Sequence, residues 1–266
     1  MQGWLTLTPA LSHQGRGSKE FLLPFSRAWE KGLGDEGESL AIRYRYKLSS
    51  INLTMSLKLY FLRHGQTRYS RDNLYCGSTN PDLTEEGHMM AKAIAKSYQS
   101  IPWTAVYASP MKRTQQTVRP LCDEIGIEPQ IREGLRELDY GAWEGETFEA
   151  VKEKYHEDYV RWLTEPAWNP PTKGETAVQV ASRASQVVTE IQQSHASGDI
   201  LVVAHKATIR IVLCSLLGID LGRYRDRIAA PVASLSVIKF DEHGPLLERL
   251  GDRAHLDDHL QNLPGT

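Results

Sequence analysis

The sequence predicts an α/β fold in which helices cover both faces of a mostly parallel central sheet, a three-layer α/β/α arrangement. Two short apolar runs, residues 59–62 and 200–204, have the composition of buried parallel strands. Between and after them, apolar residues repeat at three- and four-residue spacing, which is typical of helices packed on a sheet. At 266 residues and 41% hydrophobic, the chain is long enough for one large domain of this kind.

The first 54 residues differ in composition from the rest. Glycine, serine and mixed charges recur, and the longest apolar patch, residues 21–25, is interrupted by a proline. The patch is too short to span a membrane, and the segment lacks a signal-peptide core. We predict that residues 1–54 are a disordered extension or result from a wrongly assigned start, that residues 55–266 form the domain, and that a protein starting at Met55 folds and works.

The first predicted strand, residues 59–62, ends abruptly in Arg63, His64 and Gly65. Ligands of open α/β sheets bind beyond the carboxyl ends of the strands, and Gly65 allows the sharp turn there. Arg63 offers a planar fork of donors that matches phosphate oxygens, and a neutral imidazole at His64 is a suitable nucleophile. Taken alone, the triplet is equally well explained by a histidine that caps a turn between strand and helix.

Two further charged residues follow in separate segments. Residues 105–108 are strand-like, and Pro110 marks the start of the next helix. Arg113 would then lie near a helix N-terminus, where backbone N–H groups and the helix dipole already favour an anion. Glu137 stands in an acidic loop punctuated by glycines, and it is the candidate proton donor.

Helix patterns fill the spaces between the strands. Thr84 is a predicted N-cap, and Met89, Ala93 and Ile94 share one face of the helix that it opens. Two later stripes predict core-facing helices, namely Val180, Ala184, Val187, Val188 and Ile191, and then Ile209, Val212, Leu213, Leu216 and Leu217. Residues 146–172 predict an inserted helical cap beside the site. Its Trp162 and Trp168 either line the substrate pocket or, as we favour, pack in the core.

The second apolar run, residues 200–204, also ends in a histidine, His205, and Lys206 opens the next helix. Two parallel strands can therefore bring His64 and His205 to the same edge of the sheet. The last strand-like run, residues 234–240, has an edge that either pairs two subunits into a homodimer or is covered by the following hairpin.

Composition limits the partners that we expect. The net charge of −2 gives no reason to expect nucleic acid, and nothing indicates a membrane partner. The cysteines are Cys76, Cys122 and Cys214, an odd number without metal-ligand spacing, so neither a disulfide framework nor a metal site is predicted. Cys122 and Cys214 fit helical core positions, and a reducing cytoplasm suits all three.

The segments around His64, Arg113, Glu137 and His205, in this order, resemble those of the histidine phosphatase superfamily, which includes phosphoglycerate mutases and many small-molecule phosphatases. The resemblance runs from about residue 58 to residue 240 and implies a phosphoglycerate mutase-like fold. It implies that His64 is the nucleophile that becomes phosphorylated, that Arg63, Arg113 and His205 bind the phosphoryl group, and that Glu137 is the general acid. It further implies a small phosphorylated metabolite as substrate, with no metal and no cofactor.

Several positions depart from the superfamily pattern and are candidate substrate-binding residues. Ser70 stands where many relatives have asparagine, and Lys206 stands where many have glycine; Gly77 belongs to the same candidate set. The segments 153–162 and 252–256 are similar to those of metal-independent phosphoserine phosphatases, which implies that His255 could contact a substrate carboxylate. Tyr140 replaces a histidine of such enzymes, and His255 could equally be a surface residue.

Four functions therefore stay open. The stretch after the acidic loop is short, and Gly174, Glu175, Thr176 and Arg183 resemble the phosphatase branch, so hydrolysis of a phosphomonoester, with phosphoserine as one candidate, is favoured. The alternatives are a phosphoglycerate mutase and a phosphatase of sugar phosphates or α-ribazole phosphate. The alternative outside enzymes is a phosphoester-binding regulator, which the presence of all five pocket residues disfavours.

Overall fold

The structure is a computed structural model, and it describes residues 56–264. Our prediction for residues 1–54 lies outside the described residues. Within the described part, no helix combines the length and the apolar character needed to cross a membrane.

The central sheet has the strand order β3-β2-β4-β1-β5-β6. Strands β3, β2, β4 and β1 run parallel, whereas β5 pairs antiparallel with both β1 and β6. The mostly parallel sheet is thus confirmed, with an antiparallel hairpin at one edge. The strands are β1 (Leu57–Arg63), β2 (Trp103–Ala108), β3 (Gln130–Ile131), β4 (Gly198–Ala204), β5 (Leu235–Asp241) and β6 (Gly244–Asp252).

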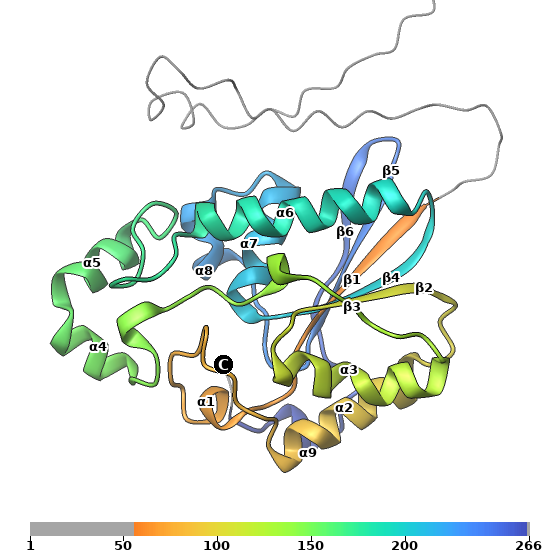
Figure 1. Cartoon of the computed structure of the whole chain (residues 1–266), viewed down its shortest axis with the longest axis horizontal. Coiled ribbons are helices and arrows are strands. Elements are labelled where there is room, and N and C mark those ends of the chain that lie inside the picture. Colours follow the sequence, from red (N-terminus) through yellow and green to blue (C-terminus); the bar gives the residue numbers. More distant parts are fainter. Residues whose placement is uncertain (1–55, 265–266) are drawn as a thin grey trace, which may run out of the picture. The chain divides into compact units, whose positions relative to one another are not determined.

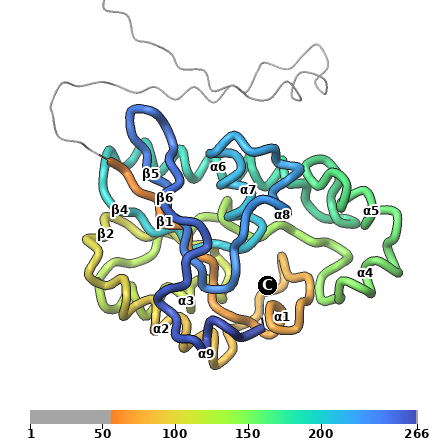
Figure 2. The backbone as a smooth tube through the Cα atoms, turned by 180° about the vertical axis from the view of Figure 1, so that it is seen from behind, coloured from red at the N-terminus to blue at the C-terminus, as the bar shows by residue number. Residues whose placement is uncertain are grey.

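Helices cover both faces of the sheet, so the predicted three-layer arrangement is confirmed (Figure 1). One face packs against α6 (Ala177–Ser194) and α7 (Lys206–Leu217), and the other against α2 (Glu85–Tyr98), α3 (Lys112–Ile125) and α9 (Asp258–Gln261). Seen from behind, α9 again lies beside α2 (Figure 2). Shorter helical segments are α1 (Arg68–Arg71), η2 (Glu133–Leu135), η3 (Gly141–Trp143), α4 (Phe148–Lys154), α5 (His156–Thr164), η4 (Leu221–Arg223) and α8 (Tyr224–Arg227).

The pattern of buried side chains explains why these segments form these layers. In β1, Leu59 and Phe61 join the core beneath α6 and α7, while Leu62 joins the core beneath α2 and α3. A strand with neighbours on both faces needs an apolar centre, and residues 59–62 of β1 supply it. Both predicted stripes, in α6 and α7, face the core.

Helix α2 differs from the prediction in its phase. Thr84 is the N-cap as predicted, and its side chain accepts a hydrogen bond from the Gly87 N–H. Met89, however, is 43% exposed, and the buried face carries Met90 and Ile94 instead. The prediction for Met89 was wrong because adjacent methionines fit two helical faces one residue apart, and only packing against β1 and α3 decides between them.

The hairpin β5–β6 decides whether the edge of the last predicted strand, residues 234–240, is free to pair with a second subunit. Strand β6 pairs along β5, so the following hairpin covers the edge that we considered for a subunit contact. A homodimer therefore stays a prediction without that edge to support it.

Cys122 and Cys214 are buried core residues, as predicted.

The range 146–172 contains helices α4 and α5, which lie at the left of Figure 1. Trp162 is 3% exposed and packs with Trp143, Val151 and Tyr159, in agreement with the favoured packing role. Trp168 is 53% exposed, so it is not a core residue.

Candidate functional site

Parallel pairing of β1 with β4 brings the two predicted histidines together. Arg63 lies opposite Ala204 in the register, and His64 and His205 follow directly. Their ring centroids are 5.2 Å apart. With Arg63, Arg113 and Glu137 they form a group that we call the histidine pocket, and all five side chains are buried.

His64 is held in one tautomer. Its Nδ1 lies 2.8 Å from the carbonyl oxygen of Gly65, which can only accept, so Nδ1 carries the proton and Nε2 keeps its lone pair. A backbone carbonyl thus fixes the ring orientation of His64. Burial, followed by the charges of Arg113 and Arg63, lowers the pKa of His64 well below its usual value, so the ring is neutral at neutral pH.

His205 is also neutral, and two partners fix its orientation. The Nε of Arg113 donates to His205 Nδ1 at 3.1 Å, and His205 Nε2 donates to the hydroxyl of Ser109 at 2.8 Å. Since Arg113 Nε can only donate, Nδ1 cannot carry a proton in this arrangement. Burial and the charge of Arg113 lower the pKa of His205 well below its usual value.

Arg113 is positioned at the second residue of α3, near the helix N-terminus as predicted. Its two terminal nitrogens donate to the carbonyl oxygens of Thr79 and Gly77, at 2.8 and 3.0 Å. Every nitrogen of its guanidinium group therefore has a protein partner, which locks the fork in one orientation.

The loop that holds Arg113 is itself held by Glu144. The carboxylate of Glu144 accepts hydrogen bonds from the backbone N–H groups of Gly77, Ser78 and Thr79 and from the Thr79 hydroxyl. This role of Glu144 was not predicted from the sequence. A glutamate between glycines after the acidic loop was the available signal, but nothing in the sequence shows which backbone it reaches.

Glu137 connects the acidic loop to α7. Its carboxylate accepts from the backbone N–H groups of Leu138, Ala207 and Thr208, at 2.9 to 3.1 Å. Arg183 donates to the carbonyl oxygen of Glu137 at 3.0 Å, so α6 also fixes this loop. Glu137 thus lies against the helix that begins directly after His205, where a helix N-terminus stabilises a carboxylate.

Arg63 is only partly bound by the protein. Its Nη1 donates to the carbonyl oxygen of Ala230 at 2.8 Å, while its buried Nε has no hydrogen-bond partner among the described residues. Burial lowers the pKa of Arg63 to about 9, so the side chain stays charged at neutral pH.

The candidate substrate-binding residues do not all lie beside the histidine pocket. Ser70 forms a capping box with Thr67 at the start of α1, and Gly77 supplies the carbonyl that holds Arg113. The Tyr140 ring lies 5.0 Å from Tyr75, and Glu137 is among the groups that act on the pKa of Tyr140. Gly77 and Tyr140 thus adjoin the histidine pocket, whereas the contacts found for Ser70 are local.

Lys206 is half-buried at the start of α7, beside the pocket. His255 lies elsewhere, because its Nδ1 is 3.1 Å from the hydroxyl of Tyr98 at the far end of α2, and none of its described contacts is with the histidine pocket. The C-terminal region does approach the site through another residue. Gln66 stands two residues after His64, and its Nε2 donates a hydrogen bond to the carbonyl oxygen of Pro264 at 2.6 Å.

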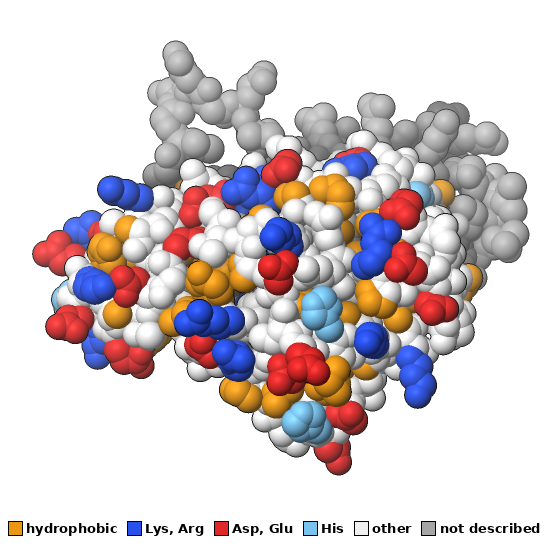
Figure 3. Space-filling view, turned by 60° about the horizontal axis from the view of Figure 1, so that its bottom comes forward, with side chains coloured by type: hydrophobic (Ala, Val, Ile, Leu, Met, Phe, Trp, Pro, Cys, Tyr) orange, Lys and Arg blue, Asp and Glu red, His pale blue; other side chains and the backbone are white. Residues whose placement is uncertain are grey.

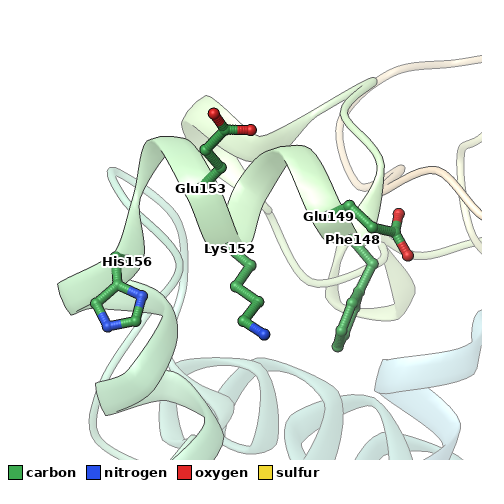
Figure 4. Close-up of a pocket in the computed structure, with 5 residues that line it drawn as sticks. All are labelled: Phe148, Glu149, Lys152, Glu153 and His156. Atoms are coloured by element: carbon green, nitrogen blue, oxygen red, sulfur yellow. The ribbon is translucent and has the colours of Figure 1, made fainter.

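A surface hollow lies on the cap and is separate from the histidine pocket. Its lining comes from α4 and the first residue of α5, namely Phe148, Glu149, Lys152, Glu153 and His156 (Figure 4). Among the residues described, no group of His, Cys, Asp and Glu is arranged to hold a metal ion. Acidic and basic side chains are interspersed over the face in Figure 3.

Comparison with known proteins is consistent with this geometry. The family model for the histidine phosphatase superfamily (branch 1) matches residues 59–253. Phosphoserine phosphatase 1 of Hydrogenobacter thermophilus is 31% identical over 202 residues, which cover 76% of this chain and 95% of that protein. A 2,3-bisphosphoglycerate-dependent phosphoglycerate mutase of Brucella melitensis biotype 2 is 30% identical over 172 residues, 62% of this chain and 84% of that protein.

A solved structure supports the fold. A mutant phosphoserine phosphatase of Entamoeba histolytica, in complex with phosphoserine, aligns with a TM-score of 0.69 at 23% identity, covering 76% of this chain and all of that one. At this identity the likeness concerns the fold alone.

Proposed function

The chain belongs to the histidine phosphatase superfamily and is a phosphomonoester hydrolase for small molecules, and from this premise we propose that it works through a phosphohistidine at His64 without a metal. The observation that carries the proposal is the hydrogen bond from His64 Nδ1 to Gly65, which leaves Nε2 with a free lone pair inside a pocket of two arginines.

In the first half-reaction, Nε2 of His64 attacks phosphorus in line with the leaving oxygen. The charge on the equatorial oxygens is stabilised by Arg63 and Arg113, which are cations at neutral pH. His205 contributes as a neutral ring, not as the additional cation that one could expect from a second histidine, because Arg113 Nε occupies its Nδ1. The negative charge of the bound phosphoryl group favours the protonated form of Glu137. Glu137 gives this proton to the leaving alkoxide, so an alcohol departs.

In the second half-reaction, Glu137 is ionised and takes a proton from water. The resulting hydroxide attacks phosphorus, the bond from phosphorus to His64 Nε2 breaks, and inorganic phosphate forms. Glu137 is protonated again, and His64 returns to the neutral tautomer. The anchoring of Glu137 to α7 holds its carboxyl group next to His205 throughout.

Phosphoserine is the leading candidate substrate, because a relative that is 31% identical over 76% of this chain is named phosphoserine phosphatase 1. The runner-up is mutase activity, which the Brucella relative supports. Sugar phosphates and α-ribazole phosphate, and a binding regulator without turnover, are the remaining alternatives. We also propose a cytoplasmic location, which a protein with unpaired cysteines suits.

The test is phosphate release by the full chain and by a protein that starts at Met55, in the presence of EDTA. The panel contains phosphoserine, 2- and 3-phosphoglycerate, fructose 2,6-bisphosphate and α-ribazole phosphate. We expect release by both proteins, with a loss of at least about 10³-fold in His64→Ala. The matched control is His243→Ala, which removes an exposed histidine and should behave like the parent.

Three other outcomes would each contradict the proposed function in a different way. Release that stops with EDTA would contradict the metal-independent mechanism. Exchange of phosphate between glycerate positions without net release would establish a mutase, and binding without either reaction would establish the regulator.

A further inference from the structure

Three cationic side chains lie together beside the histidine pocket. Lys206 and Arg210 are four residues apart on α7 and therefore share a face of the helix. Arg225 comes from α8, which packs on α7. We call these three residues the cation cluster, and Figure 1 shows α8 on the side of α7 that is toward the cap.

The cation cluster borders the reacting centre. Arg63, Arg210 and Glu137 are among the charges that act on Lys206, and Glu137 and Tyr140 act on Arg210. Burial and the neighbouring arginines lower the pKa of Lys206 to about 7, which reflects the cost of gathering like charges away from water. Lys206 directly follows His205, and the N–H of the next residue, Ala207, donates to Glu137, so the cluster begins at the edge of the histidine pocket.

Within the described part of the chain, neither an ion pair nor a side-chain hydrogen bond neutralises the charges of the cation cluster. Among residues 56–264, no carboxylate pairs with any member of the cluster, and none of the three makes a side-chain hydrogen bond. The Nε of Arg210 and the hydroxyl of Tyr224 are fully buried without a hydrogen-bond partner, and Tyr224 is only 2% exposed. Buried donors without partners are rare and costly, at roughly 1–3 kcal/mol each.

The cluster is nevertheless ordered by its surroundings. The guanidinium of Arg225 lies 3.6 Å from the ring centroid of Trp162, a cation–π contact that fixes its position. Tyr75, Tyr140 and Trp162 lie with ring centroids 5.0 to 6.5 Å apart and form an aromatic wall at the cap. A rigid wall beside unpaired cations suits a small anionic group.

From these contacts we propose that Lys206, Arg210 and Arg225 form a second anion subsite, which selects phosphomonoesters that carry another anionic group, a carboxylate or a second phosphate. The proposal rests on the proposed function, since it assumes that the reacting phosphoryl group occupies the histidine pocket. Guanidinium forks match both kinds of anion, and the test separates them.

The test measures affinity by calorimetry with full-length His64→Ala protein, so that no turnover occurs. One ligand pair is 3-phosphoglycerate and glycerol 3-phosphate, which differ by a carboxylate. The other pair is fructose 1,6-bisphosphate and fructose 6-phosphate, which differ by a phosphate. We expect the doubly anionic member of at least one pair to bind roughly ten- to hundred-fold more tightly, the size of a charge-assisted hydrogen bond.

Variants then locate the source of this preference. Lys206→Met and Arg210→Met, each made in the His64→Ala protein, should remove most of the preference, whereas Arg227→Met, on the exposed side of α8, should keep it. Lys206→Gln and Arg210→Gln serve where a methionine variant does not fold. Equal binding within both pairs, or a preference that survives in the Lys206 and Arg210 variants, would overturn the subsite.

Turnover of the parent protein separates this proposal from the proposed function. Phosphate release without any preference for doubly anionic esters would overturn the subsite and leave the phosphatase intact. Absence of release from every ester would refute the proposed function, while the calorimetric comparison would still decide whether the cluster binds an anion.

Discussion

The histidine pocket and the cation cluster are neighbours with similar charge, yet only the pocket is held by the protein. Arg113 has a partner for every guanidinium nitrogen, and Glu137 accepts hydrogen bonds from three backbone N–H groups. In the cluster, Arg210 has a buried Nε without a partner among the described residues. The comparison suggests that the pocket is preorganised for the one group shared by all substrates, and that the cluster responds to the part that varies.

The largest effect that tests this comparison is expected at Glu137. The variant Glu137→Gln cannot protonate the leaving oxygen, so kcat should fall by about 10²- to 10⁴-fold, the usual contribution of general acid catalysis. The fall should be similar for 3-phosphoglycerate and glycerol 3-phosphate, because the pocket acts on the shared phosphoryl group. Steady-state kinetics on both esters, with Glu149→Gln on the exposed side of α4 as control, measures it.

A fall for one ester alone would break the comparison, since Glu137 would then belong functionally to the cluster. A loss smaller than tenfold on both would contradict its role as the general acid.

The second prediction concerns pH and stability. Burial lowers the pKa of His64 and of His205 below 6.5, so the unfolded state binds more protons than the folded state as the pH falls below this value. Their contribution to stability is complete above about pH 6.5 and is lost below it, by at most about 2.7 kcal/mol per pH unit for two groups.

Denaturant titrations at pH 7.5, 6.5 and 5.5 measure the change in the free energy of unfolding. The variant His64→Gln should lower the slope below pH 6.5 by at most about 1.4 kcal/mol per pH unit, while His205 and His255, whose pKa values are also lowered, still contribute. His243→Gln, which removes an exposed histidine, should not change the slope. An unchanged slope in His64→Gln would show that this ring titrates alike in both states.

The smallest expected effect is on stability. It compares Ser109, which holds His205 of the histidine pocket, with Arg210 of the cation cluster. Ser109→Ala leaves the buried N–H of His205 without its acceptor and should destabilise the fold by about 1–3 kcal/mol. Arg210→Met removes a charge that has no partner and reduces repulsion with its neighbours, so stability should stay within about 0.5 kcal/mol or rise. Equal destabilisation by both variants would mean that the cluster is as structural as the pocket.

Three residues of the histidine pocket could be brought together from the sequence because they stand at the ends of strands, whereas Arg113 and Glu137 were assigned through the resemblance to the superfamily. Arg63, His64 and His205 come directly after apolar runs, and parallel pairing must bring such residues to one edge. The roles of Glu144 and Ser109 could not be predicted from the sequence. Glu144 accepts from the backbone N–H of Gly77 and Ser109 contacts His205, and both partners are distant in the sequence and come near only in the folded chain. The predicted face of α2 failed at Met89 because periodicity alone tolerates a shift of one residue.

The cluster shows a second limit of sequence reasoning. Lys206 was recognised as a departure from the superfamily pattern, but Arg225 lies on a short helix with no motif around it. Its placement depends on Trp162, which belongs to the cap and is 63 positions earlier in the chain. Such a pairing becomes visible only when the cap is packed against α8.

The central position of β1 determines when the site can exist during synthesis. Residue Leu57 pairs with Gly198 on one side and with Phe240 on the other, so both neighbours of β1 leave the ribosome long after it does. Until then His64 has neither its companion histidine nor the strand that anchors its backbone. Closing such distant contacts is slow, and a nascent chain that stops before β4 would carry the nucleophile without a pocket.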